Sequence, residues 1–103
     1  MEDEVILINC FEVPPGEEAL QAAIETWEGV RDFLKQQPGY IDTRLHRAID
    51  PSARYSLVNV ARWRSADAFR QAIGKLRSHG GPPTQPGLAA NPALYTVIRT
   101  SEP

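Results

Sequence analysis

"YSLVNVARWRSADAFRQA", residues 55–72, is the stretch that decides the fold. Its first half is rich in the β-branched and aromatic residues typical of a strand, and it ends at Trp63. Ser65 is a good N-cap for a helix that follows at once, in which apolar residues recur at helical spacing: Phe69, Ala72, Ile73 and Leu76. Asn59 is unexpected within the strand, because its amide competes for backbone hydrogen bonds.

Strand and helix signals also alternate through the rest of the chain. We expect strands at 4–13, 40–49, 54–63 and 92–100, and helices at about 17–36 and from 66 onward. The Gly- and Pro-rich stretch 78–91 predicts a loop, and its length is typical of lids and binding loops. The order βαββαβ predicts an α+β, ferredoxin-like domain over residues 1–103, with an antiparallel sheet of strand order 4-1-3-2 and both helices on one face.

Composition excludes several classes of function. The net charge of −2 is spread over interspersed charges, so we expect no nucleic-acid partner. No stretch approaches the ~20 apolar residues of a membrane span, and the acidic start is unlike a signal peptide, which favours a cytoplasmic location. The single cysteine, Cys10, excludes an internal disulfide and a thiolate metal cluster, and we expect no metal site.

Alternation along the central strands predicts what each sheet face carries. One set is apolar although both helices are expected on the other face: Ile6, Ile8, Val58 and Val60. An uncovered apolar face needs a partner, and a second copy packed sheet against sheet is the simplest one. The pattern therefore predicts a homodimer through this face.

The opposite set on each strand places an asparagine among bulky apolar residues. Asn9 shares its face with Phe11, and Asn59 shares its face with Leu57 and Trp63. We expect this set to lie under the helices, where two amides are costly unless they are paired with each other, with water or with a ligand. A structural amide pair and a pocket with two amide donors and an indole wall are both consistent with the pattern.

The segments 38–48, "PGYIDTRLHRA", and 55–72 resemble the antibiotic biosynthesis monooxygenase family of dimeric α/β-barrel proteins. The best-understood members of the family that the chain resembles oxidise anthrones to quinones without a cofactor. The resemblance implies that Asn9, Asn59 and Trp63 are catalytic, that the substrate is a small molecule, and that no cofactor is needed.

The resemblance also implies candidate substrate-binding residues. Phe69 stands where other members carry a tyrosine, and His46 stands where some carry a histidine; Phe11 and Leu57 share the strand faces of the asparagines. His46 is a candidate base because its ordinary pKa is nearest neutrality, but it alternates with Arg44, which favours an outward orientation.

Haem-degrading enzymes share the same fold. Ala72 stands where those enzymes carry a tryptophan, and His79 stands too few residues along the chain to match their histidine. The resemblance therefore does not imply haem breakdown. The function expected is a cofactor-independent monooxygenase acting on an electron-rich aromatic or polyketide-like molecule, through an enolate that reacts with O2. The alternative is a non-catalytic small-molecule-binding or accessory domain on the same fold.

Overall fold

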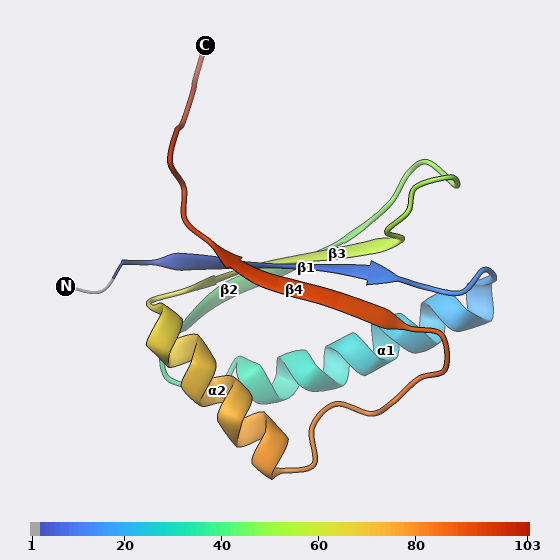
Figure 1. The fold of residues 1–103 in the computed structure, drawn as a ribbon, viewed down its shortest axis with the longest axis horizontal. Helices are drawn as coiled ribbons and strands as arrows, with labels where there is room; N and C mark the ends of the chain where they lie inside the picture. The colour runs from blue at the N-terminus through green and yellow to red at the C-terminus, as the bar shows by residue number, and fades with distance from the viewer. Residues whose placement is uncertain (1–2) are drawn as a thin grey trace.

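The computed structural model describes residues 3–103 and contains one antiparallel sheet with both helices on one face (Figure 1). The elements are β1 (Val5–Glu12), α1 (Glu17–Leu34), β2 (Tyr40–Arg47), β3 (Leu57–Trp63), α2 (Ala66–Ser78) and β4 (Ala89–Tyr95). The sheet order is β2-β3-β1-β4, so the ferredoxin-like fold and the expected strand order are confirmed. None of the helices in the described part of the chain has the length and hydropathy needed to cross a bilayer.

The connection from β3 to α2 is short because Ser65 caps the start of the helix. The Ser65 hydroxyl accepts a hydrogen bond from the backbone N–H of Ala68 at 3.0 Å, which satisfies one of the free donors of the first turn. Gly39, with φ of +93°, passes directly beneath this turn, and a Cβ at this position would collide with Ala68 Cβ. A glycine is therefore required where the entry to β2 crosses the entry to α2.

A β-bulge in β2 changes the faces that simple alternation predicts. Tyr40 pairs with Trp63 and Asp42 pairs with Arg62, so Ile41 is the extra residue between them. Without the bulge, Tyr40 would share the outer face with Asp42. With it, Tyr40 lies on the helix side, where its ring meets Trp63 edge-on at a centroid distance of 5.5 Å.

The last strand differs from the expected range of 92–100. β4 comprises Ala89–Tyr95 and pairs with β1, while residues 96–103 leave the sheet on the side away from the helices (Figure 1). Pro92 is tolerated inside β4 because this is an edge strand, where a missing N–H donor costs little. The apolar residues Val97 and Ile98, which favoured a strand, are 62% and 77% exposed.

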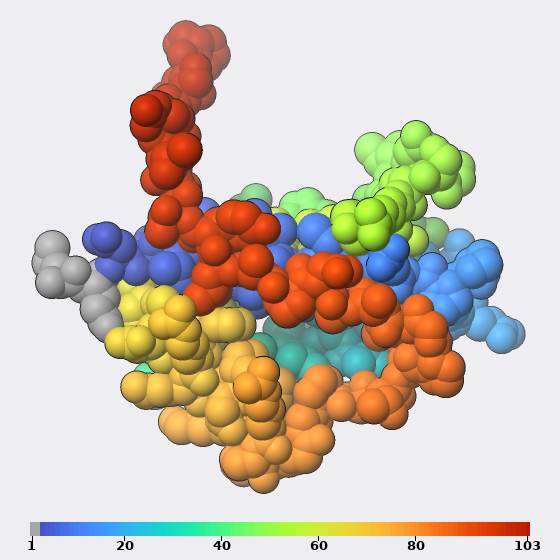
Figure 2. All heavy atoms as spheres, in the orientation of Figure 1, coloured from blue at the N-terminus to red at the C-terminus, as the bar shows by residue number. Residues whose placement is uncertain are grey.

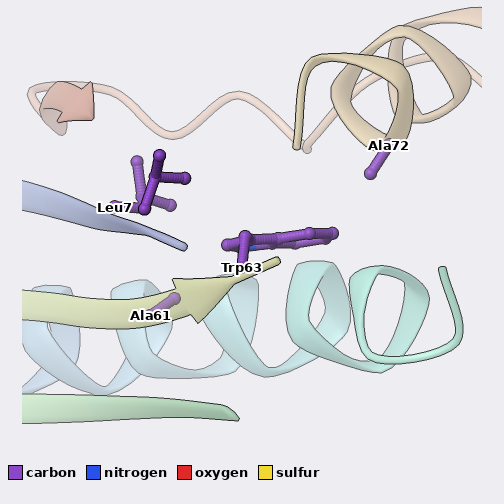
Figure 3. Packing of buried hydrophobic residues seen from close by; sticks show 5 residues of the cluster. Leu7, Ala61, Trp63 and Ala72 are labelled. Atoms are coloured by element: carbon purple, nitrogen blue, oxygen red, sulfur yellow. The ribbon is translucent and has the colours of Figure 1, made fainter. Parts of the chain in front are cut away.

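The core occupies one end of the space between sheet and helices. Figure 3 shows Trp63 reaching from the end of β3 toward Ala72 of α2, beside Leu7 and Ala61. Trp63 is only 1% exposed. By contrast, α1 buries a single residue, Ala23, along its whole length. The apolar face of α1 therefore does not close onto the sheet, and a cavity remains beneath it.

Candidate functional site

The space between the sheet and the two helices is a cavity of about 650 Å³. Its floor comes from all four strands, its walls from α1 and α2, and one side from the 79–88 loop. Figure 2 shows a hollow between β4 and α2, with α1 visible at its back. A cavity of this size matches the usual range for drug-sized ligands.

Asn9 and Asn59 both line this cavity and lie directly opposite each other on neighbouring strands. The expectation that the two amides share the helix side of the sheet is confirmed. In such a cross-strand pair the Cβ atoms are typically about 5 Å apart, so both amides reach the same small region of the floor.

The flanking strands hold the oxygen end of each amide. The backbone N–H of Asn91 donates to Asn9 Oδ1 at 3.0 Å, and the Thr43 hydroxyl donates to Asn59 Oδ1 at 2.5 Å. A backbone N–H can only donate a hydrogen bond, so the Asn9 amide is fixed with its oxygen toward β4. Within residues 3–103 neither Nδ2 atom has a hydrogen-bond partner, and neither is a fully buried orphan. The cavity floor thus carries two held amides with their NH2 ends free.

Aromatic rings form one wall of the cavity. Trp63 lies between Tyr40 and Phe69, and each of these rings meets the indole edge-on at a centroid distance of 5.5 Å. Burial raises the pKa of the Tyr40 phenol, and the Asp42 carboxylate raises it further. Tyr40 therefore stays a neutral phenol at physiological pH, and the wall suits a flat aromatic ligand.

The charged side chains described in the cavity lining all have the same sign. Among its described lining residues the charged side chains are Arg31 and Arg77, with no aspartate, glutamate or histidine. Arg31 pairs with Asp32 at 3.0 Å, and its guanidinium lies over the Trp27 ring, 5.2 Å from the centroid. The same contact, a hydrogen bond from Arg31, lowers the pKa of Asp32 below its ordinary value.

Five of the seven residues expected at the site line the cavity: Asn9, Asn59, Trp63, Phe69 and Phe11. His46 is not among them, because it pairs with Val58 on the opposite face of the sheet. There it is exposed, and its Nδ1 lies 3.1 Å from the Val58 carbonyl oxygen. The prediction that His46 lies at the substrate site is therefore wrong, and His46 is not part of the candidate site.

Leu57 must also be removed from the site. It faces the helix side as expected, but it is 2% exposed and does not line the cavity. Its side chain is packed, so its contribution is to the fold.

The sequence missed several lining residues. Trp27 lines the cavity together with Val30 and Arg31 from the same face of α1. Leu76 and Arg77 extend the lining along α2. The periodicity that marks these faces as apolar was visible in the sequence, but it cannot distinguish a packed face from one that borders a cavity.

The loop between α2 and β4 borders the cavity, as its composition suggested. Thr84, Gln85 and Leu88 are among its lining residues. Gln85 Nε2 donates to the backbone oxygen of Ala19 at 3.1 Å, which joins the loop to α1. The mobility of this loop stays a prediction.

The family model for antibiotic biosynthesis monooxygenases matches residues 4–73, which include both asparagines and Trp63. The chain belongs to this family. The matched region contains β1, α1, β2, β3 and the start of α2, and with them both amides of the cavity floor.

Relatives of this family member are described as oxygenases. It is 30% identical to deoxynogalonate monooxygenase from Streptomyces nogalater over 100 residues, covering 97% of this chain and 72% of the relative. A crystal structure of a candidate monooxygenase from Shewanella loihica PV-4 has a TM-score of 0.87 at 53% identity, covering 97% of this chain and 99% of the other. SnoaB, a cofactor-independent oxygenase from Streptomyces nogalater, has a TM-score of 0.67 at 26% identity, with 95% and 96% covered. These similarities support a monooxygenase.

Proposed function

We propose that this protein is a cofactor-independent monooxygenase that oxidises an electron-rich aromatic or polyketide-like small molecule. The observation that carries the proposal is the pair of amides on the cavity floor, with oxygens held by flanking strands and NH2 groups free. Similarity to a cofactor-independent oxygenase supports the same reading. The cytoplasmic location suggested by the sequence stays a prediction.

The two amides suit a substrate carbonyl that gains negative charge. Loss of a proton from an acidic carbon next to an aromatic ketone gives an enolate, and its oxygen then accepts hydrogen bonds from Asn9 and Asn59. The electron-rich enolate transfers an electron to O2, and the resulting radicals combine to a peroxide at the same carbon. Loss of water converts the CH2 group and O2 to C=O and H2O, so no external reductant is required.

A protein base is missing from the described lining of the cavity, whose titratable side chains are Tyr40, Arg31 and Arg77. Burial and Asp42 both raise the pKa of Tyr40, so this phenol is protonated and serves as a donor. The substrate must then be acidic enough to ionise to water once its enolate is stabilised. This requirement favours phenolic, conjugated ketones.

The histidine on the outer face should therefore have no role in proton transfer. We expect His46→Gln to leave kcat/KM within about twofold of the unmodified protein, and kcat/KM to rise with pH along the substrate's own ionisation. Initial rates between pH 6 and pH 9, with two substrates of different acidity, check this. A profile that bends near the ordinary pKa of histidine and flattens in His46→Gln would restore His46 as the base.

Oxygen uptake tests the proposed function directly. Purified protein treated with a chelator should accelerate the oxidation of a hydroxyanthrone above the buffer rate, with one O2 consumed per quinone formed. Added catalase should return no oxygen, because the second oxygen atom leaves as water. Heat-treated protein is the control for adventitious catalysis.

The alternative function is a binding or accessory domain. It gains support if hydroxyanthrones and hydroxynaphthalenes bind in the cavity while none is oxidised faster than in buffer. Absence of both binding and turnover across such a panel would contradict both functions.

We further propose that the protein acts as a homodimer through the sheet face opposite the helices. On this face Ile6 lies opposite Arg62, while Ile8 lies opposite Val60. Two segments rise beside the face, the 48–56 connection and the 96–103 segment (Figure 1). Their apolar side chains have little cover, with Ile49 99% and Ile98 77% exposed. A second copy would cover the face and both segments together.

A further inference from the structure

We propose that the substrate carries an anionic group, such as a carboxylate, and that Arg77 binds it at the α2 side of the cavity. This rests on the proposed function, because it names the class of molecule that the same cavity takes. The substrate would be an aromatic acid, with its ring system over the amides and its charge toward the helices.

The first argument is the sign of the charge around the cavity. The protein carries a net charge of −2, yet both charged side chains among the described lining residues are arginines. An acidic protein with a cation-lined cavity favours anionic ligands locally and repels them elsewhere. Arg77 is exposed, so its interaction with an anion is screened by salt and is strongest at low ionic strength.

The two arginines differ in what they already bind. Arg31 is engaged, because its guanidinium makes two hydrogen bonds to Asp32 Oδ1, at 3.0 and 3.1 Å, and lies over Trp27. For Arg77, by contrast, no carboxylate of residues 3–103 lies within ion-pair distance. Arg77 thus has its guanidinium available for a ligand, and a guanidinium fork fits a carboxylate with two parallel hydrogen bonds.

The third argument is the placement of polar groups over the cavity. The amides lie on the sheet floor, whereas Arg77 lies in the last turn of α2, together with Leu76. The rest of the lining is mostly apolar and aromatic, and it includes Trp63, Phe69 and Ile73. A flat molecule with a ketone at one end and an acid at the other satisfies both regions and leaves its rings against apolar walls.

Ionisation of the substrate gives the arginine a second effect. A cation close to the bound molecule favours the enolate over the neutral ketone, which is the ionisation that the cavity must promote without a base of its own. Arg77 would be a substrate-binding residue in this reaction, and the amides would remain the groups that contact the reacting carbonyl.

A matched pair of probes tests the proposal. Isothermal titration of the whole protein with 6-hydroxy-2-naphthoate and with 6-hydroxy-2-naphthamide, whose oxygen groups lie at opposite ends of the rings, compares one carboxylate with its neutral counterpart. At low ionic strength, where screening is weakest, the protein should bind the naphthoate at least about tenfold more tightly, equivalent to about 1.4 kcal/mol.

The variants then assign the preference to one side chain. Arg77→Gln should bring the two affinities to within about threefold while changing naphthamide affinity by less than about twofold. Arg77→Lys should keep part of the preference. Arg70→Gln is the matched control, since Arg70 lies on the same helix outside the cavity lining, pairs with Asp67 at 3.7 Å, and loses the same charge.

Each other outcome overturns the proposal. Equal affinity of the unmodified protein for both probes, equal weakening of both by Arg77→Gln, or equal loss of preference in Arg70→Gln shows that Arg77 does not bind an anion. If the naphthamide alone binds, or neutral hydroxyanthrones are oxidised with no loss in Arg77→Gln, the proposed function stands and this inference fails. If neither probe binds and no aromatic is oxidised, both fail.

Discussion

Replacing Asn59 with alanine should lower kcat by about 100-fold or more while the protein stays folded. The amide lies on the cavity floor with its oxygen held by Thr43, so its NH2 group faces the cavity, where we propose that the enolate oxygen forms. Removing one such donor typically costs about 2.7–4 kcal/mol of transition-state stabilisation. Single-turnover oxidation of a hydroxyanthrone, followed by quinone absorbance, measures this loss apart from substrate binding.

The same substitution also leaves the Thr43 hydroxyl without its acceptor, which costs about 1–3 kcal/mol of stability. Thr43→Val is therefore the matched control, because it breaks the same hydrogen bond and keeps the amide donor. We expect Thr43→Val to lower the free energy of unfolding similarly and kcat far less. If the two variants lose the same activity, or if Asn59→Ala retains full activity, the amide is structural and its catalytic assignment is wrong.

Much of this site was predictable because strand periodicity is rigid. A residue's face in a strand follows from its parity, so Asn59 and Trp63, four residues apart, had to share a side. The bulky residues around them pointed that side toward the helices. The cavity confirms both steps, because Asn59 and Trp63 line it together with residues of α1 and α2.

His46 shows what happens when a resemblance is preferred to that periodicity. Its neighbour Leu45 pairs with Asn59 on the cavity side, so His46 had to face outward. Alternation with Arg44 already indicated this, and it was the better guide.

Other features lay beyond local sequence rules. The bulge that moves Tyr40 into the cavity depends on how β2 docks on β3, and nothing in "PGYIDTRL" reports it. Arg77 shares the lining face of α2 with Phe69 and Ile73 at a spacing of four residues, but periodicity does not tell whether this end of the face borders a cavity. The end of β4 was misjudged because Val97 and Ile98 have strand propensity but lie beyond Tyr95, where the pairing of β4 with β1 ends, and are largely exposed.

Exposed apolar residues such as these support the proposed dimer. We expect Val58→Asp to weaken dimerisation more than any other substitution considered. Val58 lies on the uncovered face, opposite Cys10 of β1 and His46 of β2. An unpaired carboxylate buried there costs at least about 3 kcal/mol, so the dimer dissociation constant should rise about 100-fold or more. Sedimentation velocity at micromolar concentrations measures the change.

Control variants and two spectroscopic or chemical measurements separate dissociation from unfolding. Gln71→Asp places the same charge on the exposed face of α2 and should leave the dimer intact. Cys10, opposite Val58, should react slowly with a thiol reagent in the unmodified dimer and quickly in Val58→Asp, while circular dichroism shows the helices retained. A milder variant, Val58→Thr, should weaken the dimer without unfolding the chain, because it nearly keeps the side chain's shape. Unmodified protein that sediments as a monomer would contradict the dimer, since the apolar face and both projecting segments would then be stable in water.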